Sequence, residues 1–342
     1  MNDPTNDRKI EHIRIIGDDR DVDRRKRYFE SIRLTHRALP EIDLSEVNPG
    51  TTFLGKRLSF PLMISSMTGG DHDLVRSINH NLAIAAEASG VAMGVGSQRV
   101  MFTHPEARGS FALREAAPTA LLCSNLGAIQ LNHGFDIKAC QEAISVLGAD
   151  ALYLHLNPLQ EAIQPEGNTN FRGLLAKITE IATTLDVPVI LKEVGAGFSP
   201  VDVERLRGSA VRHIDVAGAG GTSWSRIENH RNAGDVDGLG IRFQDWGIPT
   251  PVALQLLKPY QDEFIFIASG GIRSGLDMVK ALILGARVCG LASPFLKPAI
   301  KSAEAVIDAI ERLKSEFTTA MFLMGITTTD NLFQNESLIL QV

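Results

Sequence analysis

The stretch "FIFIASGGIRSGLDMVKALILGA" (264–286) contains one complete structural unit. A short apolar run leads into a glycine-rich turn, and the turn opens an amphipathic stretch with helical spacing. This order is typical of a βα unit, in which a buried strand is followed by a helix that covers it. Comparable apolar runs occur at 60–67, 91–95, 120–127, 151–157, 187–195, 211–218 and 286–293.

Amphipathic stretches separate these runs, for example "DLVRSINHNLAIAAEAS" (73–89) and "DIKACQEAISVLG" (136–148). Eight βα units in series predict an α/β fold, a (β/α)8 TIM barrel over residues 51–342 preceded by an N-terminal extension over residues 1–50. A doubly wound open sheet is the main alternative.

The ends of the apolar runs favour the barrel. They read "SMTGG", "VGSQR", "SNLG", "HLNPLQE", "KEVG", "DVAGAGGT" and "SGGIRSG". In a barrel of parallel strands these ends converge on one face, where the fold places its active site. Turns need glycine and serine in any case, but they do not need Gln98, Arg99, Gln160 or Lys192.

Composition narrows the class of protein. The chain has 342 residues, 44% hydrophobic and 22% charged, with a net charge of −6, which argues against a nucleic-acid platform. The three cysteines are far apart and form neither a disulfide framework nor a zinc motif. No signal peptide and no membrane-length apolar stretch is apparent, so we expect a soluble, cytoplasmic protein.

Two segments are interpreted as peripheral. The charge run "DDRDVDRRKRYF" (18–29) is expected to be a solvated helix face or loop. The polar, glycine-rich segment 226–251 is expected to be a mobile loop over the barrel mouth or an oligomer contact.

Glycine-rich turns at two successive strand ends predict a phosphate site. "SGGIRSG" (269–275) opens a helix, so backbone N–H groups and the helix dipole favour an anion there. "DVAGAGGTSW" (215–224) adds a second such turn with the hydroxyl of Thr222. Beyond this phosphate, Lys192 is placed to pair with a heteroaromatic ring or to form a structural ion pair. Thr68, Ser97 and Asn125 are interpreted as ring contacts or as helix caps.

These motifs, together with "RKIEHI" (8–13), resemble type 2 isopentenyl-diphosphate isomerases from about residue 8 to the last strand. "HLNPLQE" and the "RKxEH" pattern are the discriminating pieces. The resemblance implies an FMN-dependent TIM barrel that interconverts isopentenyl and dimethylallyl diphosphate in isoprenoid biosynthesis. It also implies reduced FMN, Mg²⁺, NADPH or another reductant, and a homo-oligomer, commonly a tetramer or octamer.

The resemblance also implies roles for individual residues. Flavin contacts fall on Met67, Thr68, Ser97, Asn125, Lys192, Thr222, Gly271, Arg273, Ala292 and Ser293. Substrate contacts fall on Arg8, Lys9, Arg99, His155, Asn157 and Gln160, and the metal falls on Glu161. Trp224 and Glu228 match positions near the flavin, and "LASPFL" is a looser match than the other motifs.

The residue types suggest how the reaction would proceed. A buried diphosphate needs cations or a metal, which Arg8, Lys9, Arg99, His155 and a Mg²⁺ on Glu161 would supply. Gln160 does not titrate near neutral pH, and no ordinary side chain protonates an unactivated alkene. Our hypothesis is that reduced flavin acts as acid and base at its N5/N1 edge, while Gln160 orients the alkene or assists proton removal.

Other interpretations remain open on the sequence alone. Glu161 suits a helix start, Arg8 and Lys9 suit a solvated tail, and His155 suits a core histidine. An FMN-dependent oxidoreductase on the same barrel is the nearest alternative function, although neither glycine-rich turn supplies its catalytic histidine and His213 lies within a strand. A non-catalytic flavin-binding protein would have no reason for "HLNPLQE".

Overall fold

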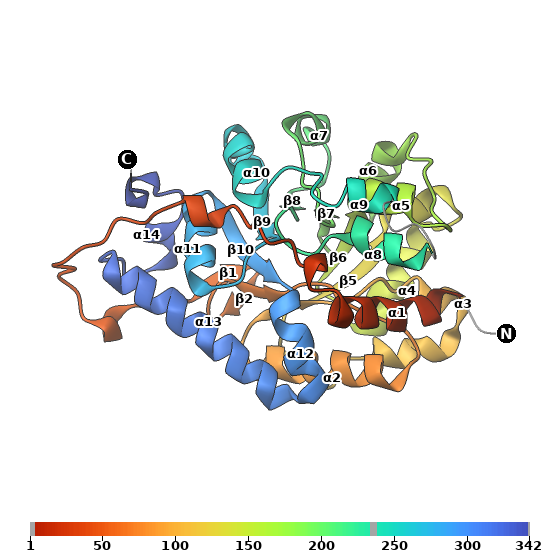
Figure 1. The fold of residues 1–342 in the computed structure, drawn as a ribbon, viewed down its shortest axis with the longest axis horizontal. Helices are drawn as coiled ribbons and strands as arrows, with labels where there is room; N and C mark the ends of the chain where they lie inside the picture. The colour runs from red at the N-terminus through yellow and green to blue at the C-terminus, as the bar shows by residue number, and fades with distance from the viewer. Residues whose placement is uncertain (1–3, 233–237, 341–342) are drawn as a thin grey trace.

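A closed barrel of parallel strands forms the centre of the molecule (Figure 1). The computed structural model describes residues 4–232 and 238–340, with side chains from residue 9 onward. The barrel order is β10-β3-β4-β5-β6-β7-β8-β9. The strands are β3 (Leu62–Ile64), β4 (Ala92–Gly94), β5 (Leu122–Gly127), β6 (Ala151–Leu156), β7 (Val189–Glu193), β8 (His213–Asp215), β9 (Ile265–Ser269) and β10 (Ala286–Leu291). Each of the eight apolar runs contains one of them, so the predicted barrel is confirmed and the open sheet is not.

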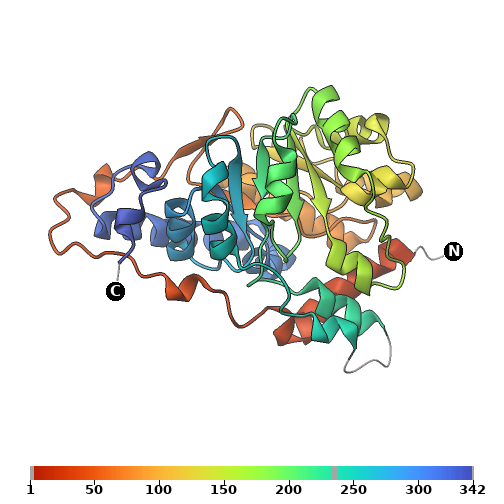
Figure 2. The ribbon, with the colours of Figure 1, turned by 90° about the horizontal axis from the view of Figure 1, so that it is seen from above.

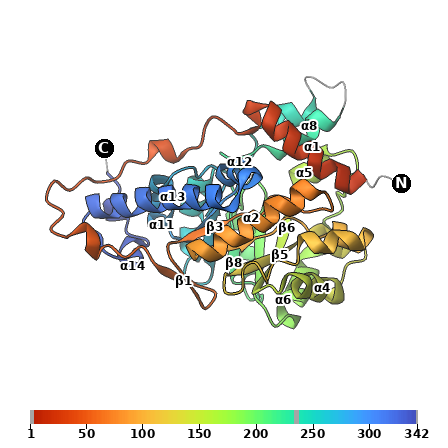
Figure 3. The ribbon, with the colours of Figure 1, turned by 90° about the horizontal axis from the view of Figure 1, so that it is seen from below.

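Helices cover the outside of the barrel. They are α2 (Asp73–Ser89), α4 (Ile137–Leu147), α6 (Leu174–Thr184), α7 (Pro200–Leu206), α10 (Thr250–Leu256), α11 (Gly275–Ile283), α12 (Ser293–Lys301) and α13 (Ala303–Leu323). Local sequence fixes their ends: Asp136 caps the start of α4, and Ser274 with Asp277 forms a capping box on α11. The C-terminal α13 packs along α2, α11 and α12 (Figures 1 and 3).

Shorter helical pieces lie in the connecting segments. They are η1 (Arg20–Val22), η2 (Phe29–Ser31), η3 (Leu44–Glu46), α3 (Val100–Thr103), η4 (Pro105–Ser110), η5 (Ala128–Asn132), α5 (Pro158–Ile163), α8 (Trp224–Arg231), α9 (Leu239–Arg242), η6 (Lys258–Tyr260), α14 (Thr329–Leu332) and η7 (Glu336–Leu338). Within the described residues, no helix is both long enough and apolar enough to cross a bilayer.

The inside of the barrel is apolar at its amino end and polar at its carboxyl end. The hairpin of β1 (Thr51–Phe53) and β2 (Lys56–Leu58) closes the amino end, because Phe53 and Leu58 share one buried cluster with Met63 and Tyr153. Strand register then sets the polar level, since Lys192 lies opposite both His155 and Asp215 on its neighbouring strands. Inward-facing polar side chains therefore gather where the strands end.

The N-terminal extension crosses the barrel mouth. Helix α1 (Pro4–Asp18) lies against α8, as Figures 2 and 3 show from opposite sides. The chain then runs past the second glycine-rich turn, where Asp23 forms a bridge with Thr222, and continues to the C-terminal region, where Leu34 forms a bridge with Ile339.

Both segments interpreted as peripheral are more ordered than expected. The charge run 18–29 is not simply solvated, because Arg24 is only 5% exposed and donates to the carbonyls of Gly195, Gln244 and Trp246. The segment 226–251 is not one loop, since it contains most of α8 and all of α9. Residues 233–237 of that segment lie outside the described residues, and its mobility stays a prediction.

Candidate active site

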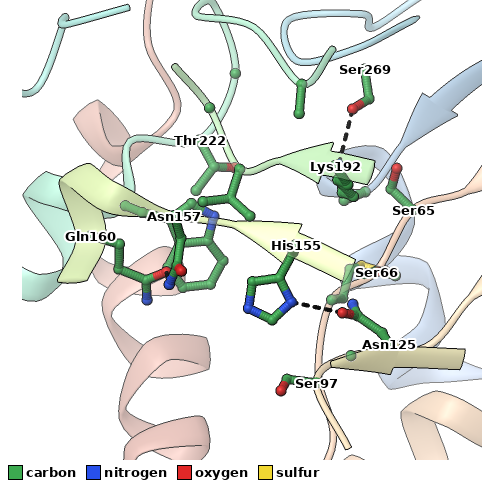
Figure 4. A pocket seen from close by; sticks show the side chains of 18 of the residues that line it. Ser65, Ser66, Ser97, Asn125, His155, Asn157, Gln160, Lys192, Thr222 and Ser269 are labelled. Carbon is green, nitrogen blue, oxygen red and sulfur yellow. Dashed lines mark hydrogen bonds between the residues drawn. The ribbon is translucent and has the colours of Figure 1, made fainter. Parts of the chain in front are cut away.

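One pocket at the carboxyl end of the barrel collects nearly all the residues singled out from the sequence (Figure 4). Those that line it are Lys9, Met67, Ser97, Arg99, Asn125, His155, Asn157, Gln160, Glu161, Lys192, Thr222, Trp224, Gly271, Arg273, Ala292 and Ser293. Thr68 is buried but does not line the pocket, and the side chain of Arg8 lies outside the described residues.

The two glycine-rich turns pack main chain against main chain at one end of the pocket. Gly270 and Gly271 have φ values of +92° and +81°. An added Cβ at Gly270 would collide with the carbonyl oxygen of Gly218, and one at Gly271 would lie 3.0 Å from the carbonyl group of Gly220. Side chains are therefore excluded, and backbone groups form the wall of the pocket.

Other features at this end suit a phosphate and a flat ring. Ala292, the N-cap of the nine-residue α12, makes no side-chain cap. Pro294 has no N–H and the Phe295 N–H donates to the Ala292 carbonyl, so the N–H that this helix start offers to an anion is that of Ser293, which lines the pocket. The hydroxyl oxygens of Ser65 and Ser66 are buried, line the pocket and have no hydrogen-bond partner within the described residues. Unpaired buried hydroxyls are unusual unless a ligand completes them, so this end fits FMN.

Ser65 and Ser66 were not predicted as contacts. They lie at the end of the first barrel strand, Ser66 as the first residue of the quoted "SMTGG" and Ser65 directly before it. Strand alternation was the available signal, because it places Ser65 two residues after the inward-facing Met63. The alternative cap roles of Thr68, Ser97 and Asn125 do not hold. His72 caps α2, Arg99 stands at the N-cap of α3, and Asn125 donates to the carbonyl of Val95.

Lys192 forms the ion pair that was one of its two interpretations. Its Nζ lies 3.0 Å from Asp215 Oδ2 and donates to Ser269 Oγ at 3.1 Å. Lys192 also lines the pocket, so a ring contact remains compatible with the ion pair. Figure 4 shows Lys192 and Ser269 side by side at the pocket wall.

His155 is held in one orientation at the next strand. Its Nδ1 lies 2.7 Å from Asn125 Oδ1, and because the Asn125 amide nitrogen already donates to Val95, the imidazole must donate this bond. Nε2 is then the ring nitrogen that points away from Asn125. Gly127 leaves room for the ring, because a Cβ there would lie 3.2 Å from Nε2. His155 is therefore not a plain core histidine.

Positive charge is available at the mouth. Arg99 lines the pocket, and its guanidinium has no hydrogen bond or ion pair within the described residues. Lys9 comes from α1 and is half-buried at the same pocket, so it does not belong to a solvated tail. Arg273, by contrast, is already paired with Asp23 of the extension. Arg99 is therefore a cation whose charge is free to bind an anion in the pocket.

Glu161 sits in the first turn of α5 with unusual surroundings. It is 6% exposed, and its neighbours are neutral: Asn157 Nδ2 and Gln164 Nε2 donate to it at 2.9 and 2.7 Å. It has no cationic partner within the described residues. A buried carboxylate without a counter-charge is costly, so the donor set fits a cation that arrives with the substrate. Asn157 Oδ1 is likewise buried without a partner.

A hydrogen bond to Glu228 fixes the position of the Gln160 side chain. The Gln160 amide donates to Glu228 Oε1 at 2.8 Å, which fixes which end of the amide faces the carboxylate. Glu228 is fully buried, lies 3.2 Å from His12 Nε2 on α1 and accepts from Arg231 at 2.6 Å. Burial opposes ionisation of Glu228, but the hydrogen bonds from His12, Gln160 and Arg231 outweigh it and lower the pKa to about 2. His12 was not predicted, although it ends the quoted "RKxEH" pattern.

The charge of Glu228 should make stability depend on pH in acid. Because the folded-state pKa lies below the ordinary 4.5, stabilisation is complete above pH 4.5 and is lost as pH falls toward 2. The full effect is about 3 kcal/mol. Urea unfolding from pH 6 down to pH 3 should show a smaller loss for Glu228→Gln than for the parent chain. Glu166→Gln, which removes a more exposed partner of the same Arg231, is the control and should follow the parent. Equal slopes for Glu228→Gln and the parent would contradict this role.

The chain resembles one protein family and several relatives over most of its length. The sequence profile of the FMN-dependent dehydrogenase family matches residues 13–103 and 152–339. The isopentenyl-diphosphate delta-isomerase of Paracoccus zeaxanthinifaciens is 55% identical over 338 residues, covering 98% of this chain and 97% of that protein. The enzyme of the same name from Hydrogenovibrio crunogenus is 53% identical, covering 98% of both chains.

Solved structures with the same fold are flavoproteins. The flavin-binding domain of baker's yeast flavocytochrome b2 superposes with a TM-score of 0.66 at 18% identity, covering 94% of this chain and 79% of that one. A mandelate oxidase variant with an FMN adduct gives 0.62 at 18% identity, covering 90% and 87%. At such identities the likeness shows the fold alone.

Proposed function

The chain belongs to the isopentenyl-diphosphate delta-isomerase family, and we propose how its pocket serves the interconversion of isopentenyl and dimethylallyl diphosphate. The protein is an FMN-dependent isomerase. One observation carries the assignment of the substrate end. Within the described residues, the pocket is lined both by a cation without a partner, Arg99, and by a buried carboxylate without a counter-charge, Glu161. A free diphosphate with its magnesium ion complements both.

The diphosphate is bound at the mouth by Arg99, Lys9 and His155. Charge-assisted hydrogen bonds to phosphate oxygens are stronger than neutral ones, and Arg99 gives up no other partner to make them. His155 donates through Nε2 when it is protonated, with its orientation already set by Asn125. Arg8 precedes Lys9 and is placed in the same role.

Glu161 would hold Mg²⁺, and phosphate and water would supply the remaining ligands. The described residues contain no cluster of three or more histidine, cysteine or acidic side chains, so the protein alone does not build a metal cage. A magnesium ion that uses one carboxylate and substrate phosphates matches this arrangement.

Gln160 would face the five-carbon chain of the bound substrate. Reduced FMN, when bound, supplies the acid–base chemistry of the 1,3-allylic proton shift. Gln160 orients the double bond, because Glu228 holds its amide nitrogen and Asn157 donates to its carbonyl oxygen at 3.1 Å. Met67, Ser97, Asn125, Thr222 and Lys192 would hold the flavin ring, and Gly271, Arg273, Ala292 and Ser293 would hold its phosphate.

The oxidoreductase alternative expects a catalytic histidine from the late strands of the barrel, and neither glycine-rich turn supplies one. His213 lies two residues before Asp215 on β8, with its ring against Phe53 of the hairpin that closes the opposite end. Burial lowers the pKa of His213 to about 4. We place the enzyme in the cytoplasm as a homo-oligomer, tetramer or octamer, with NADPH or another reductant reducing the flavin.

The test is anaerobic incubation with isopentenyl diphosphate, reduced FMN and Mg²⁺ in deuterated water. Formation of dimethylallyl diphosphate with deuterium incorporation, read by NMR, is expected without consumption of an electron acceptor. Acceptor consumption equal to product would instead establish an oxidoreductase. In the metal arm, EDTA should stop turnover, and Glu161→Gln should raise the Mg²⁺ concentration for half-maximal rate about tenfold. Unchanged behaviour in that arm would remove the metal from Glu161.

A further inference from the structure

A chain of buried polar groups lies inside the barrel below the flavin end of the pocket. Lys192 and Ser269 line the pocket, but Asp215 does not, and it is completely buried. Tyr153 lies deeper still, also fully buried, with its hydroxyl 2.8 Å from Met63 Sδ. These groups come from adjacent strands, since β6, β7, β8 and β9 are consecutive neighbours in the barrel.

The Asp215 carboxylate is surrounded by donors. Oδ1 accepts from Ser269 Oγ at 2.5 Å and from the backbone N–H of Ala217 at 3.3 Å. Oδ2 lies 3.0 Å from Lys192 Nζ and 3.4 Å from the Tyr153 hydroxyl. The carboxylate is therefore fixed on both sides and has no room to turn away from Lys192.

The lysine is correspondingly constrained. An ammonium has three N–H donors, and two of them point to Asp215 and Ser269. The third is left for the pocket that Lys192 lines. A buried ion pair is weak evidence for stability, because an apolar pair of similar volume is often as stable. Stability alone therefore does not explain why Lys192 and Asp215 form a buried ion pair beside the pocket.

We propose that Asp215 is a positioning residue for the flavin reaction: it supplies the counter-charge that keeps the Lys192 ammonium in the buried wall, and it aims the remaining N–H at the flavin ring. Ser269 helps to orient the lysine, because it accepts from Lys192 and donates to Asp215. This inference rests on the proposed placement of the flavin against Lys192. The positive end of the pair faces the ring, so it favours the more electron-rich reduced flavin over the oxidised one.

Removing only the carboxylate should imitate removal of the lysine. In Asp215→Asn the ammonium is buried without a counter-charge and sheds its proton, as buried uncompensated charges do. We expect the ratio of affinities for reduced and oxidised FMN to fall about tenfold in Asp215→Asn and in Lys192→Met alike. The double variant should show no further fall, because both changes remove the same positive charge.

The measurement is a dye-equilibrium redox titration of the FMN-loaded proteins, which requires no turnover. Ser269→Ala is the matched control, since it keeps the ion pair and should change the ratio less than Asp215→Asn. An unchanged or increased ratio in Asp215→Asn, with a decreased ratio in Lys192→Met, would overturn the role of Asp215 and leave the proposed function intact. An unchanged ratio in Lys192→Met would overturn the placement of the flavin as well.

Folding is separated from positioning by the double variant. Asp215→Asn alone leaves the buried Lys192 amine without its ionic partner and is expected to lower the melting temperature. Asp215→Asn combined with Lys192→Met removes both members of the pair and should recover part of that loss while keeping the low affinity ratio. If the affinity ratio recovered together with the melting temperature, Asp215 would be only structural.

Discussion

Replacing Gln160 by alanine is expected to lower the turnover number of the reduced, FMN-loaded enzyme by at least about 100-fold, the usual scale for loss of a group positioned at the reacting atoms. The KM for isopentenyl diphosphate should change much less, because Arg99, Lys9 and Glu161 bind the charged end independently. The physical reason is orientation: Glu228 and Asn157 fix both ends of the Gln160 amide, and alanine removes the group that we propose orients the alkene.

Two variants make the result specific. Gln160→Asn keeps an amide but shortens the side chain by one methylene, so it should lose the Glu228 hydrogen bond and most of the activity. Gln141→Ala removes an exposed glutamine from α4 and should turn over like the parent chain. Turnover of Gln160→Ala within a few-fold of the parent would exclude Gln160 from the chemistry and leave only the binding roles.

Periodicity and strand-end chemistry were sufficient to predict the fold. Each apolar run was short and ended in small or polar residues, so both the strands and their common direction followed. Helix α2 occupies the 73–89 stretch noted in the sequence, because its caps, His72 and Gly90, are local features. Lys9 and Ser293, which line the same pocket, were assigned to the site through the family resemblance and not through periodicity.

Contacts that depend on tertiary placement could not be predicted. The charge run 18–29 has the composition of a solvated segment, yet Arg24 is buried because three carbonyl oxygens from distant loops converge on it. Nothing local in the sequence encodes that convergence. Arg273 was predicted as a flavin contact, but its pairing with Asp23 involves residues 250 positions apart.

The support beneath the site was missed for the same reason. Glu228 was noted only as a family position, whereas its buried contacts with Gln160, His12 and Arg231 join three separate helices. Sequence patterns report which residues face a pocket more readily than which residues hold them there. The pairing of Asp215 with Lys192 was not predicted either, but the sequence held a signal for it, because the two residues lie on adjacent strands in matching register.

Removing the flavin is expected to abolish isomerisation while leaving substrate binding. The side chains proposed to lie beside the alkene cannot protonate it: Gln160 does not titrate, and the buried Glu228 behind it has its pKa lowered to about 2 and is held ionised by three donors. The rate of isomerisation should therefore fall in proportion to FMN content, as measured by NMR of the product after stripping and refilling the same preparation.

Two controls separate loss of chemistry from loss of fold. They are circular dichroism of the stripped protein and retained binding of isopentenyl diphosphate through Arg99 and Glu161. Refilling with FMN should restore activity only after reduction, and full turnover by the colourless protein would mean that an amino acid, not the flavin, moves the proton.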